Sequence, residues 1–199
     1  LQHVRPMSLD DLLQREPIKT DHQELSPFIA GKRLLVTGAG GSIGSELCRQ
    51  IAQYNPQSLV LFERYENALH SLMLELKAAF PAVTILPVIG DVTVPDRVSE
   101  VFQRARPDIV FHAAAHKHVP LMELNPKEAI RNNVLGTRVV AEAALKAGVD
   151  RFVLISTDKA VNPSSVMGAT KRIAEHVMQE FQRTGLTKFT VVRFGNVLG

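Results

Sequence analysis

The chain has 199 residues, of which 45% are hydrophobic and 22% are charged. This composition is that of an ordinary globular protein, and the length suits about one domain. The net charge of +3 comes from scattered Lys and Arg residues without a basic block or interleaved aromatic residues, which argues against a nucleic-acid-binding protein. No apolar run reaches the roughly 20 residues of a membrane-spanning helix, so we expect this part of the protein to be soluble.

The first 30 residues differ from the rest of the chain. They contain three prolines, many charges and one short amphipathic piece, LDDLLQR at 9–15. We predict an N-terminal arm or linker over 1–30 and a single domain over 31–199. Because the chain begins with Leu1 rather than Met and stops just after the last predicted strand, we expect a piece of a longer protein, truncated before a C-terminal substrate lobe.

From residue 32 onward, short apolar runs alternate with segments of helical periodicity. Six runs predict buried strands, at 33–37, 58–62, 83–90, 108–114, 151–156 and 189–194. Five segments predict helices, at 43–54, 66–80, 95–105, 126–147 and 165–184. Strands without polar interruption are typical of a parallel sheet that is covered on both faces. We therefore predict a doubly wound α/β domain with the strand order 3-2-1-4-5-6.

A glycine-rich loop, TGAGGSIG, joins the first strand to the first helix of this series. Gly38, Gly41 and Gly44 have the spacing that permits a tight turn and the close approach of a pyrophosphate. The backbone amides of Ser42, Ile43 and Gly44 then lie at the positive end of a helix and can hold phosphates. Within a strand–loop–helix context, this pattern predicts a dinucleotide-binding Rossmann domain over 31–199.

The end of the second strand indicates which dinucleotide binds. A carboxylate at Glu63 can accept hydrogen bonds from the adenosine ribose and repels a 2′-phosphate, which favours NAD over NADP. Arg64 could instead hold a 2′-phosphate, or the two side chains could form a plain surface ion pair. Further residues expected to border the cofactor follow the third and fourth strands, and they are Asp91, Val92, Ala113, Ala114 and Ala115.

Several motifs together resemble the extended short-chain dehydrogenase/reductase family. They are TGxxGxxG at 37–44, the Asp91-Val92 pair, HAAA at 112–115, NVLGT at 133–137, and STDK at 156–159 with Lys171. Four further stretches, RPMSLDDLLQREP (5–17), HKHVPLME (116–123), STDKAVNP (156–163) and RFGNVLG (193–199), narrow the resemblance. Over essentially the whole chain it is similar to the CapD-type polysaccharide-biosynthesis nucleotide-sugar 4,6-dehydratases, in their large, membrane-anchored branch.

This resemblance implies an NAD-dependent reaction on UDP-N-acetylglucosamine. NAD takes hydride from sugar C4, water leaves from C5 and C6, and the hydride returns to C6, giving a UDP-4-keto-6-deoxy-N-acetylhexosamine. The resemblance further implies a homo-oligomer that pairs through the helices at 126–147 and 165–184. It also implies a membrane anchor outside this chain, at the cytoplasmic face of the bacterial inner membrane. The 199-residue chain alone is expected to bind NAD and to turn over nothing.

The same resemblance assigns the reacting residues. Asp158 is the acid for the C6 hydroxyl and Lys159 the base for the C5 proton, so Asp158 must be protonated and Lys159 neutral at some stage. Thr157 offers a hydroxyl near C4, and Lys171 binds the nicotinamide ribose. Met167 marks the large branch, because most relatives have a tyrosine there, and a thioether cannot transfer a proton. The C4 hydroxyl must therefore lose its proton to Asp158, to a water or to a relay through Thr157.

Other polar residues carry weaker signals. The residues expected to contact the substrate are Lys117, Asn133 and Asn196. Lys117 could instead be an ordinary exposed lysine, and Asn133 could brace the active-site backbone or fill the core of a helix. His112, His116 and His118 form a group that could suggest a metal site. Without cysteines or patterned carboxylates beside them, we expect no metal and interpret them as loop residues beside the substrate pocket.

Two other functions fit these residues less well than the dehydratase does. An epimerase or simple dehydrogenase of nucleotide sugars needs the C4 base that Met167 replaces, and it has no use for the Asp158–Lys159 pair. A non-catalytic NAD-binding module has no reason to keep Lys171 and that pair together. The dehydratase is therefore the function that the sequence favours.

Overall fold

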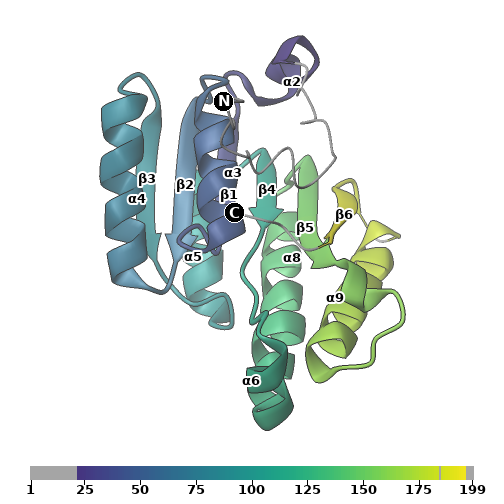
Figure 1. Ribbon diagram of the computed structural model, residues 1–199. Coiled ribbons are helices and arrows are strands. Elements are labelled where there is room, and N and C mark those ends of the chain that lie inside the picture. Colours follow the sequence, from purple (N-terminus) through teal and green to yellow (C-terminus); the bar gives the residue numbers. More distant parts are fainter. Residues whose placement is uncertain (1–21, 184, 196–199) are drawn as a thin grey trace, which may run out of the picture.

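The computed structural model describes residues 22–183 and 185–195. Its centre is a six-stranded parallel sheet in the order β3-β2-β1-β4-β5-β6, which confirms the predicted topology (Figure 1). The strands are β1 (Arg33–Thr37), β2 (Ser58–Glu63), β3 (Thr84–Ile89), β4 (Ile109–His112), β5 (Arg151–Thr157) and β6 (Lys188–Phe194).

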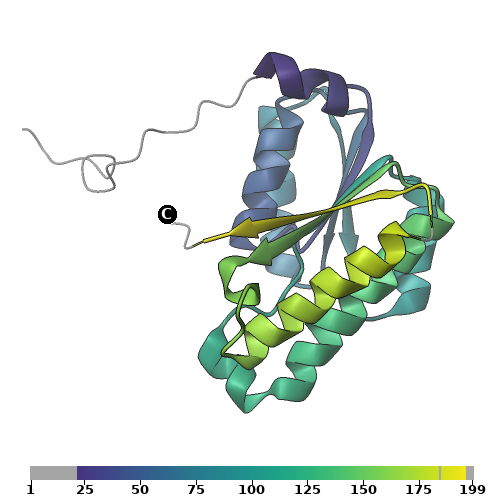
Figure 2. The same ribbon diagram turned by 90° about the vertical axis from the view of Figure 1, so that its right-hand side faces the viewer.

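Helices cover both faces of this sheet, as Figure 2 shows. On one face lie α3 (Ser42–Ala52) and α4 (Glu66–Ala79), and on the other lie α5 (Pro95–Ala105), α8 (Thr137–Lys146) and α9 (Val166–Gln182). Successive residues of β1 serve the two faces in turn, with Leu34 and Val36 in one apolar cluster and Leu35 in the other. Because burying one such side chain stabilises the fold by about 1.5–3 kcal/mol, the uninterrupted apolar strands are a consequence of this double cover.

The helix predicted over 126–147 is present as one continuous helical segment, but it contains a π-helical turn that the sequence did not predict. It consists of α7 (Pro126–Ile130), a π-helical turn η1 (Arg131–Gly136) and then α8, and the unpredicted α6 (Val119–Leu124) precedes it. Helix α6 is too short for a helical period to be recognised, and Leu124 on it is 79% exposed. Single π turns are frequent at functional sites, because they re-aim the side chains that they carry.

Part of the predicted arm packs on the domain. Helix α2 (His22–Ile29) precedes β1, and Ile29 is buried in the same cluster as Leu34. The guanidinium of Arg151 lies 5.1 Å from the centre of the Phe28 ring. The amphipathic piece at 9–15 lies outside the described residues. Among the described residues, no helix combines the length and the apolar character needed to cross a membrane.

Candidate active site

The loops that follow β1, β2, β3 and β4 enclose a cavity of about 490 Å³. Doubly wound sheets bind their ligands at this edge, where the strands have their carboxyl ends. Nine residues predicted around a cofactor line the cavity, namely Gly38, Gly41, Glu63, Arg64, Asp91, Val92, Ala113, Ala114 and Ala115. Other lining residues were not predicted as cofactor contacts, namely Gly40, Phe62, Tyr65, Ala68, Gly90, His116, His118 and Asn132.

The glycines of the first loop allow the chain to turn beneath this cavity. Gly38 has a φ of +67°, and a Cβ there would lie 2.6 Å from the backbone nitrogen of Ala114. A Cβ on Gly44 would clash with the carbonyl oxygen of Gly38. Helix α3 begins directly after this turn, at Ser42. The first amides of a helix have no partner within it, so those of residues 42–44 are available as donors directly after the cavity-lining residue Gly41.

The Glu63 carboxylate is held at the rim of the cavity by backbone amides. Its Oε2 accepts from the Gly40 amide at 3.0 Å, and its Oε1 accepts from the amides of Arg64 (2.9 Å) and Tyr65 (3.0 Å). Only glycine fits at residue 40, since a Cβ would lie 2.7 Å from that of Ala68. A carboxylate offers about four acceptor positions, so one remains for a ligand hydroxyl.

Arg64 reaches across the cavity instead of pairing with the Glu63 side chain. Its Nη1 lies 3.6 Å from Asp91 Oδ2, and its Nη2 lies 3.4 Å from His116 Nε2. Partial burial alone would raise the pKa of Asp91, but the Thr93 amide and the Arg64 charge outweigh it and lower that pKa. Burial, followed by the Arg64 charge, lowers the pKa of His116. The guanidinium thus joins the loops after β2, β3 and β4.

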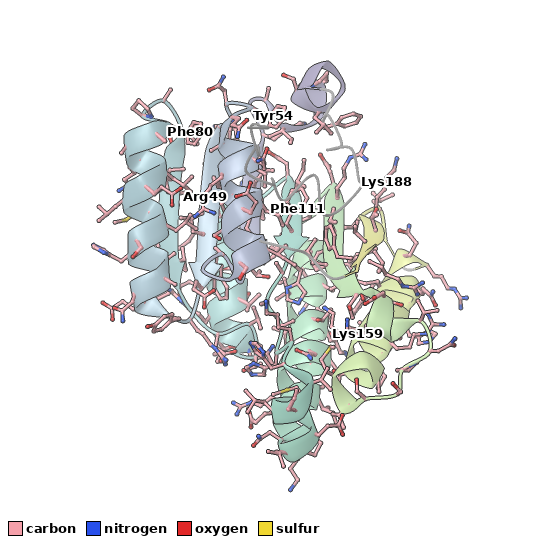
Figure 3. All side chains as sticks on the ribbon, viewed as in Figure 1. Arg49, Tyr54, Phe80, Phe111, Lys159 and Lys188 are labelled. Atoms are coloured by element: carbon pink, nitrogen blue, oxygen red, sulfur yellow. The ribbon has the colours of Figure 1, made fainter. Side chains whose placement is uncertain are left out.

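A second group of residues lies at the carboxyl end of β5. Thr157 Oγ1 donates to Asp158 Oδ1 at 2.9 Å, and Lys159 Nζ lies 3.2 Å from the same oxygen. Lys159, labelled in Figure 3, lies in the turn that leads from β5 to α9. The Thr157 hydroxyl, followed by Lys159, lowers the pKa of Asp158, whose side chain is 55% exposed. As it stands Asp158 is therefore ionised, which is the opposite of what a proton donor needs.

Helix α9 brings Met167 and Lys171 to this end of the sheet. Lys171 is 5% exposed, and its Nζ donates to the carbonyl oxygen of Ile155 at 2.6 Å. Burial lowers the pKa of Lys171 to about 8, and Glu175 partly opposes this change. Met167, one turn earlier, packs in an apolar cluster with Met122 of α6 and with α7. The thioether thus serves as packing between these helices.

Asn133 acts as a brace, and its predicted contact with the substrate has no support in this geometry. It is fully buried, and its Nδ2 donates to the His116 carbonyl and to Thr170 Oγ1, both at 3.0 Å. Its Oδ1 accepts from the His116 amide at 2.8 Å and from Asn132 at 3.1 Å. Both ends of the amide are used, so the bracing alternative describes Asn133.

His112 belongs to strand β4 and is buried, so its interpretation as a loop residue is wrong. Its Nδ1 lies 2.6 Å from Thr37 Oγ1, and its Nε2 lies 3.0 Å from Thr137 Oγ1. Because Thr137 donates its own proton to the carbonyl of Asn133 at 2.6 Å, we infer that Nε2 carries the imidazole proton. Burial, followed by the Lys171 charge, lowers the pKa of His112 to about 3, so this ring is neutral.

The remaining predicted residues lie as follows. His116 and His118 are in the loop after β4 and line the cavity, and Lys117 is exposed between them. The described part of the chain holds no group of three or more His, Cys, Asp or Glu residues that could bind a metal ion. Asn196 lies outside the described residues. The cavity residues follow strands β1 to β4, and the Asp158–Lys159 pair follows β5, the neighbour of β4. Both groups therefore lie at the same edge of the sheet.

Residues 34–199 match the family described as polysaccharide biosynthesis protein. The chain belongs to this family. It is 51% identical over 201 residues to the capsular polysaccharide biosynthesis protein CapD of Staphylococcus aureus, covering 100% of this chain and 34% of that protein. The resemblance to CapD-type proteins found in the sequence is thus confirmed.

In two other relatives, this chain covers a larger share of the relative's length. A UDP-N-acetylglucosamine 4,6-dehydratase (inverting) of Campylobacter jejuni is 35% identical over 173 residues, which are 85% of this chain and 50% of that enzyme. The structure of Pen from Bacillus thuringiensis has a TM-score of 0.79 at 35% identity, covering 86% of this chain and 52% of that one. The chain thus spans between a third and about half of the length of these relatives.

Proposed function

We propose that this chain carries the catalytic half of an NAD-dependent 4,6-dehydratase acting on UDP-N-acetylglucosamine. The observation that carries the proposal is the contact between Thr157, Asp158 and Lys159 at the end of β5, at the same edge of the sheet as the glycine-lined cavity. Dehydration needs an acid and a base close together, and a carboxyl and an amine 3.2 Å apart supply both. The relatedness to a dehydratase of this substrate over 85% of the chain supports the same choice.

The residues around the cavity fit NAD. The amides at the start of α3 suit its diphosphate, and the remaining acceptor position on Glu63 suits a ribose hydroxyl. Arg64 is already engaged with Asp91, and the negative charge of Glu63 repels a 2′-phosphate, which supports NAD over NADP. When bound, NAD supplies the chemistry of taking up the C4 hydride and returning it at C6.

The side chains at the end of β5 would move the protons of this reaction. The bond from Thr157 to Asp158 supports a relay in which Thr157 accepts the proton of the C4 hydroxyl and passes its own to Asp158. Asp158 would then be protonated and could give that proton to the departing C6 hydroxyl. Lys159 would take the C5 proton as water leaves, and it would return a proton to C5 when the hydride reaches C6, which completes the methyl product. Met167 has no part in this proton transfer.

The test is a proton NMR time course in D₂O with UDP-N-acetylglucosamine and NAD. It uses a longer form of the protein that continues past Gly199, with the 199-residue chain in parallel. A new C6 methyl signal with deuterium at C5 is the expected result for the longer form. Lys159→Ala should abolish the signal, whereas the control Lys77→Ala, on the distant helix α4, should not. We further propose that the 199-residue chain binds NAD and gives no methyl signal.

Two results would contradict the dehydratase. If the sugar epimerises at C4 without a methyl signal, the protein is an epimerase. If NAD binds and the sugar stays unchanged in the longer form, either the domain is a non-catalytic NAD-binding module or its substrate is another sugar. The homo-oligomer, the membrane anchor outside this chain and the cytoplasmic location remain predictions. Analytical ultracentrifugation of the 199-residue chain checks the first of them.

A further inference from the structure

A buried carboxylate, Glu175 of α9, lies behind the Thr157–Lys159 turn. Its side chain is 2% exposed. Oε1 accepts from Ser156 Oγ at 2.7 Å and from Arg193 Nε at 2.9 Å, and Oε2 accepts from Arg193 Nη2 at 2.7 Å and from Arg172 Nη1 at 3.2 Å. Burial alone would raise the pKa of Glu175, but Arg193 and Ser156 outweigh it, and the carboxylate is ionised.

These contacts join three elements at one level of the fold. Ser156 of β5 and Arg193 of β6 are partners in the parallel ladder, so their side chains stand together beneath α9. One helical turn before Glu175, Lys171 donates to the carbonyl of Ile155, the residue before Ser156. Side chains of α9 therefore hydrogen-bond two consecutive residues of β5, and the next residue along the strand is Thr157.

The ionic contact between Glu175 and its arginines constrains the relative orientation of these side chains, which an apolar contact would not do. A paired charge in a protein interior adds little net stability compared with well-packed apolar residues, because desolvation costs about as much as the attraction gains. A bidentate guanidinium–carboxylate pair does fix the orientation of both groups. In the same interface, α9 also packs on the sheet through Ala174 and Met178, which are apolar. Near its other end, Gln182 Oε1 accepts from the Phe189 amide of β6 at 2.8 Å. The charged contacts of Glu175 lie toward the end that bears the reacting residues.

We propose that Glu175 is a positioning residue that holds the end of β5 against α9, so that Thr157, Asp158 and Lys159 keep a fixed place relative to Lys171. The proposal rests on the proposed function, since it takes those four residues as the reacting group. The Glu175 side chain is 2% exposed, so it has almost no surface that a ligand could contact. It acts through Ser156, and Arg193 with Arg172 balances its charge.

Two variants separate the positioning role from a role in folding. Ser156→Ala removes the link to β5 and leaves the Glu175–Arg193 pair intact. Glu175→Gln keeps the size and an acceptor for Ser156 but removes the charge that orients both arginines. The control for Ser156→Ala is Ser71→Ala, which removes an exposed hydroxyl from a helix. The control for Glu175→Gln is Glu100→Gln, which neutralises an exposed carboxylate that pairs with two arginines of α5.

The first measurement is amide hydrogen exchange over residues 157–161 of the 199-residue chain. In the intact protein the Lys159 amide donates to Thr157 Oγ1 at 3.3 Å and the Val161 amide donates to the Asp158 carbonyl at 3.0 Å. We expect exchange there to be about tenfold faster in both variants, with α3 and the controls unchanged. Exchange within about twofold of the wild type in Ser156→Ala would overturn the proposal, even if Glu175→Gln does not fold.

The second measurement is steady-state turnover of the longer form, normalised to the fraction of protein that binds NAD. Both variants should lower kcat about ten- to hundredfold and leave KM for the sugar within about threefold, because misplaced groups act mainly on the transition state. A raised KM with unchanged kcat would overturn the proposal. If the wild type itself gives no methyl signal, the proposed function fails, and the exchange measurement still decides whether Glu175 positions the turn.

Discussion

The buried ammonium group of Lys171 makes the stability of this protein depend on pH. Burial lowers its pKa from the ordinary value of 10.5 to about 8 in the folded protein. Below pH 8 both states hold the proton, and the folded state bears the whole cost of the buried charge. Between the two values the unfolded chain binds a proton that the folded chain does not, so the free energy of unfolding rises with pH.

The size of this effect follows from the two pKa values. Their difference corresponds to about 3 kcal/mol over the whole window, and about 1.3 kcal/mol of it falls between roughly pH 7 and 9. Cys48 acts in the opposite direction at higher pH. Burial raises the pKa of its thiol from 9.0 to about 12, so its contribution to stability is lost as pH rises above 9.

The assay is urea unfolding followed by circular dichroism, for the wild type and Lys171→Met at about pH 7, 8 and 9. Methionine fills a similar space and does not titrate, and both proteins contain Cys48, so their difference isolates Lys171. We expect the wild type to gain about 1.3 kcal/mol relative to the variant over this range. A difference that stays constant with pH would refute the reasoning, since it would mean that Lys171 keeps the same pKa in both states.

Three further predictions concern the loop glycine, the brace and the thioether. Gly38→Ala should weaken NAD binding at least about tenfold in calorimetry, because its Cβ meets backbone at 2.6 Å, whereas Gly31→Ala, also at φ +67° but with nothing within 4 Å, should not. Asn133→Ala leaves the amide and carbonyl of His116 without their partner and should cost about 2–4 kcal/mol in urea unfolding, and a loss below about 1 kcal/mol would contradict the brace. Met167→Leu keeps the apolar packing and should leave kcat of the longer form within about threefold; a hundredfold loss would show that the sulfur takes part in the reaction.

Much of the fold could be predicted because its signals are local. The apolar run at 33–37 has the bounds of β1, and the segment at 95–105 has the bounds of α5, which starts at Pro95 and ends before Arg106 in a left-handed conformation. Pro95 in the first turn and the left-handed Arg106 after the last turn are both local features of this helix. The π-helical turn η1 has no such local signal, because His116 and Thr170, which bond the Asn133 side chain, are 17 and 37 residues away.

In the candidate site, too, the features with local signals could be predicted and those that depend on distant residues could not. The spacing of the glycines and the place of Glu63 after a buried strand were enough to predict the cavity, since the carboxyl ends of parallel strands meet at one edge of the sheet. The sequence could not predict that Arg64 turns to Asp91, or that Gly40 must be small beside Ala68. Both depend on which side chains of other loops come near.

The sequence by itself determined the strand order, the glycine turn and the identity of the residues Thr157, Asp158, Lys159 and Lys171. Tertiary structure alone decided the burial of Lys171 and the support behind the turn. Lys171 has a lowered pKa because α9 lies on β5. The pKa of Asp158 is lowered by its neighbours in the sequence, first by the Thr157 hydroxyl and then by Lys159. Glu175 meets Ser156 and Arg193 only when α9, β5 and β6 have assembled. The burial of Lys171 and the partners of Glu175 arise from residues far apart in the chain, and no local pattern encodes them.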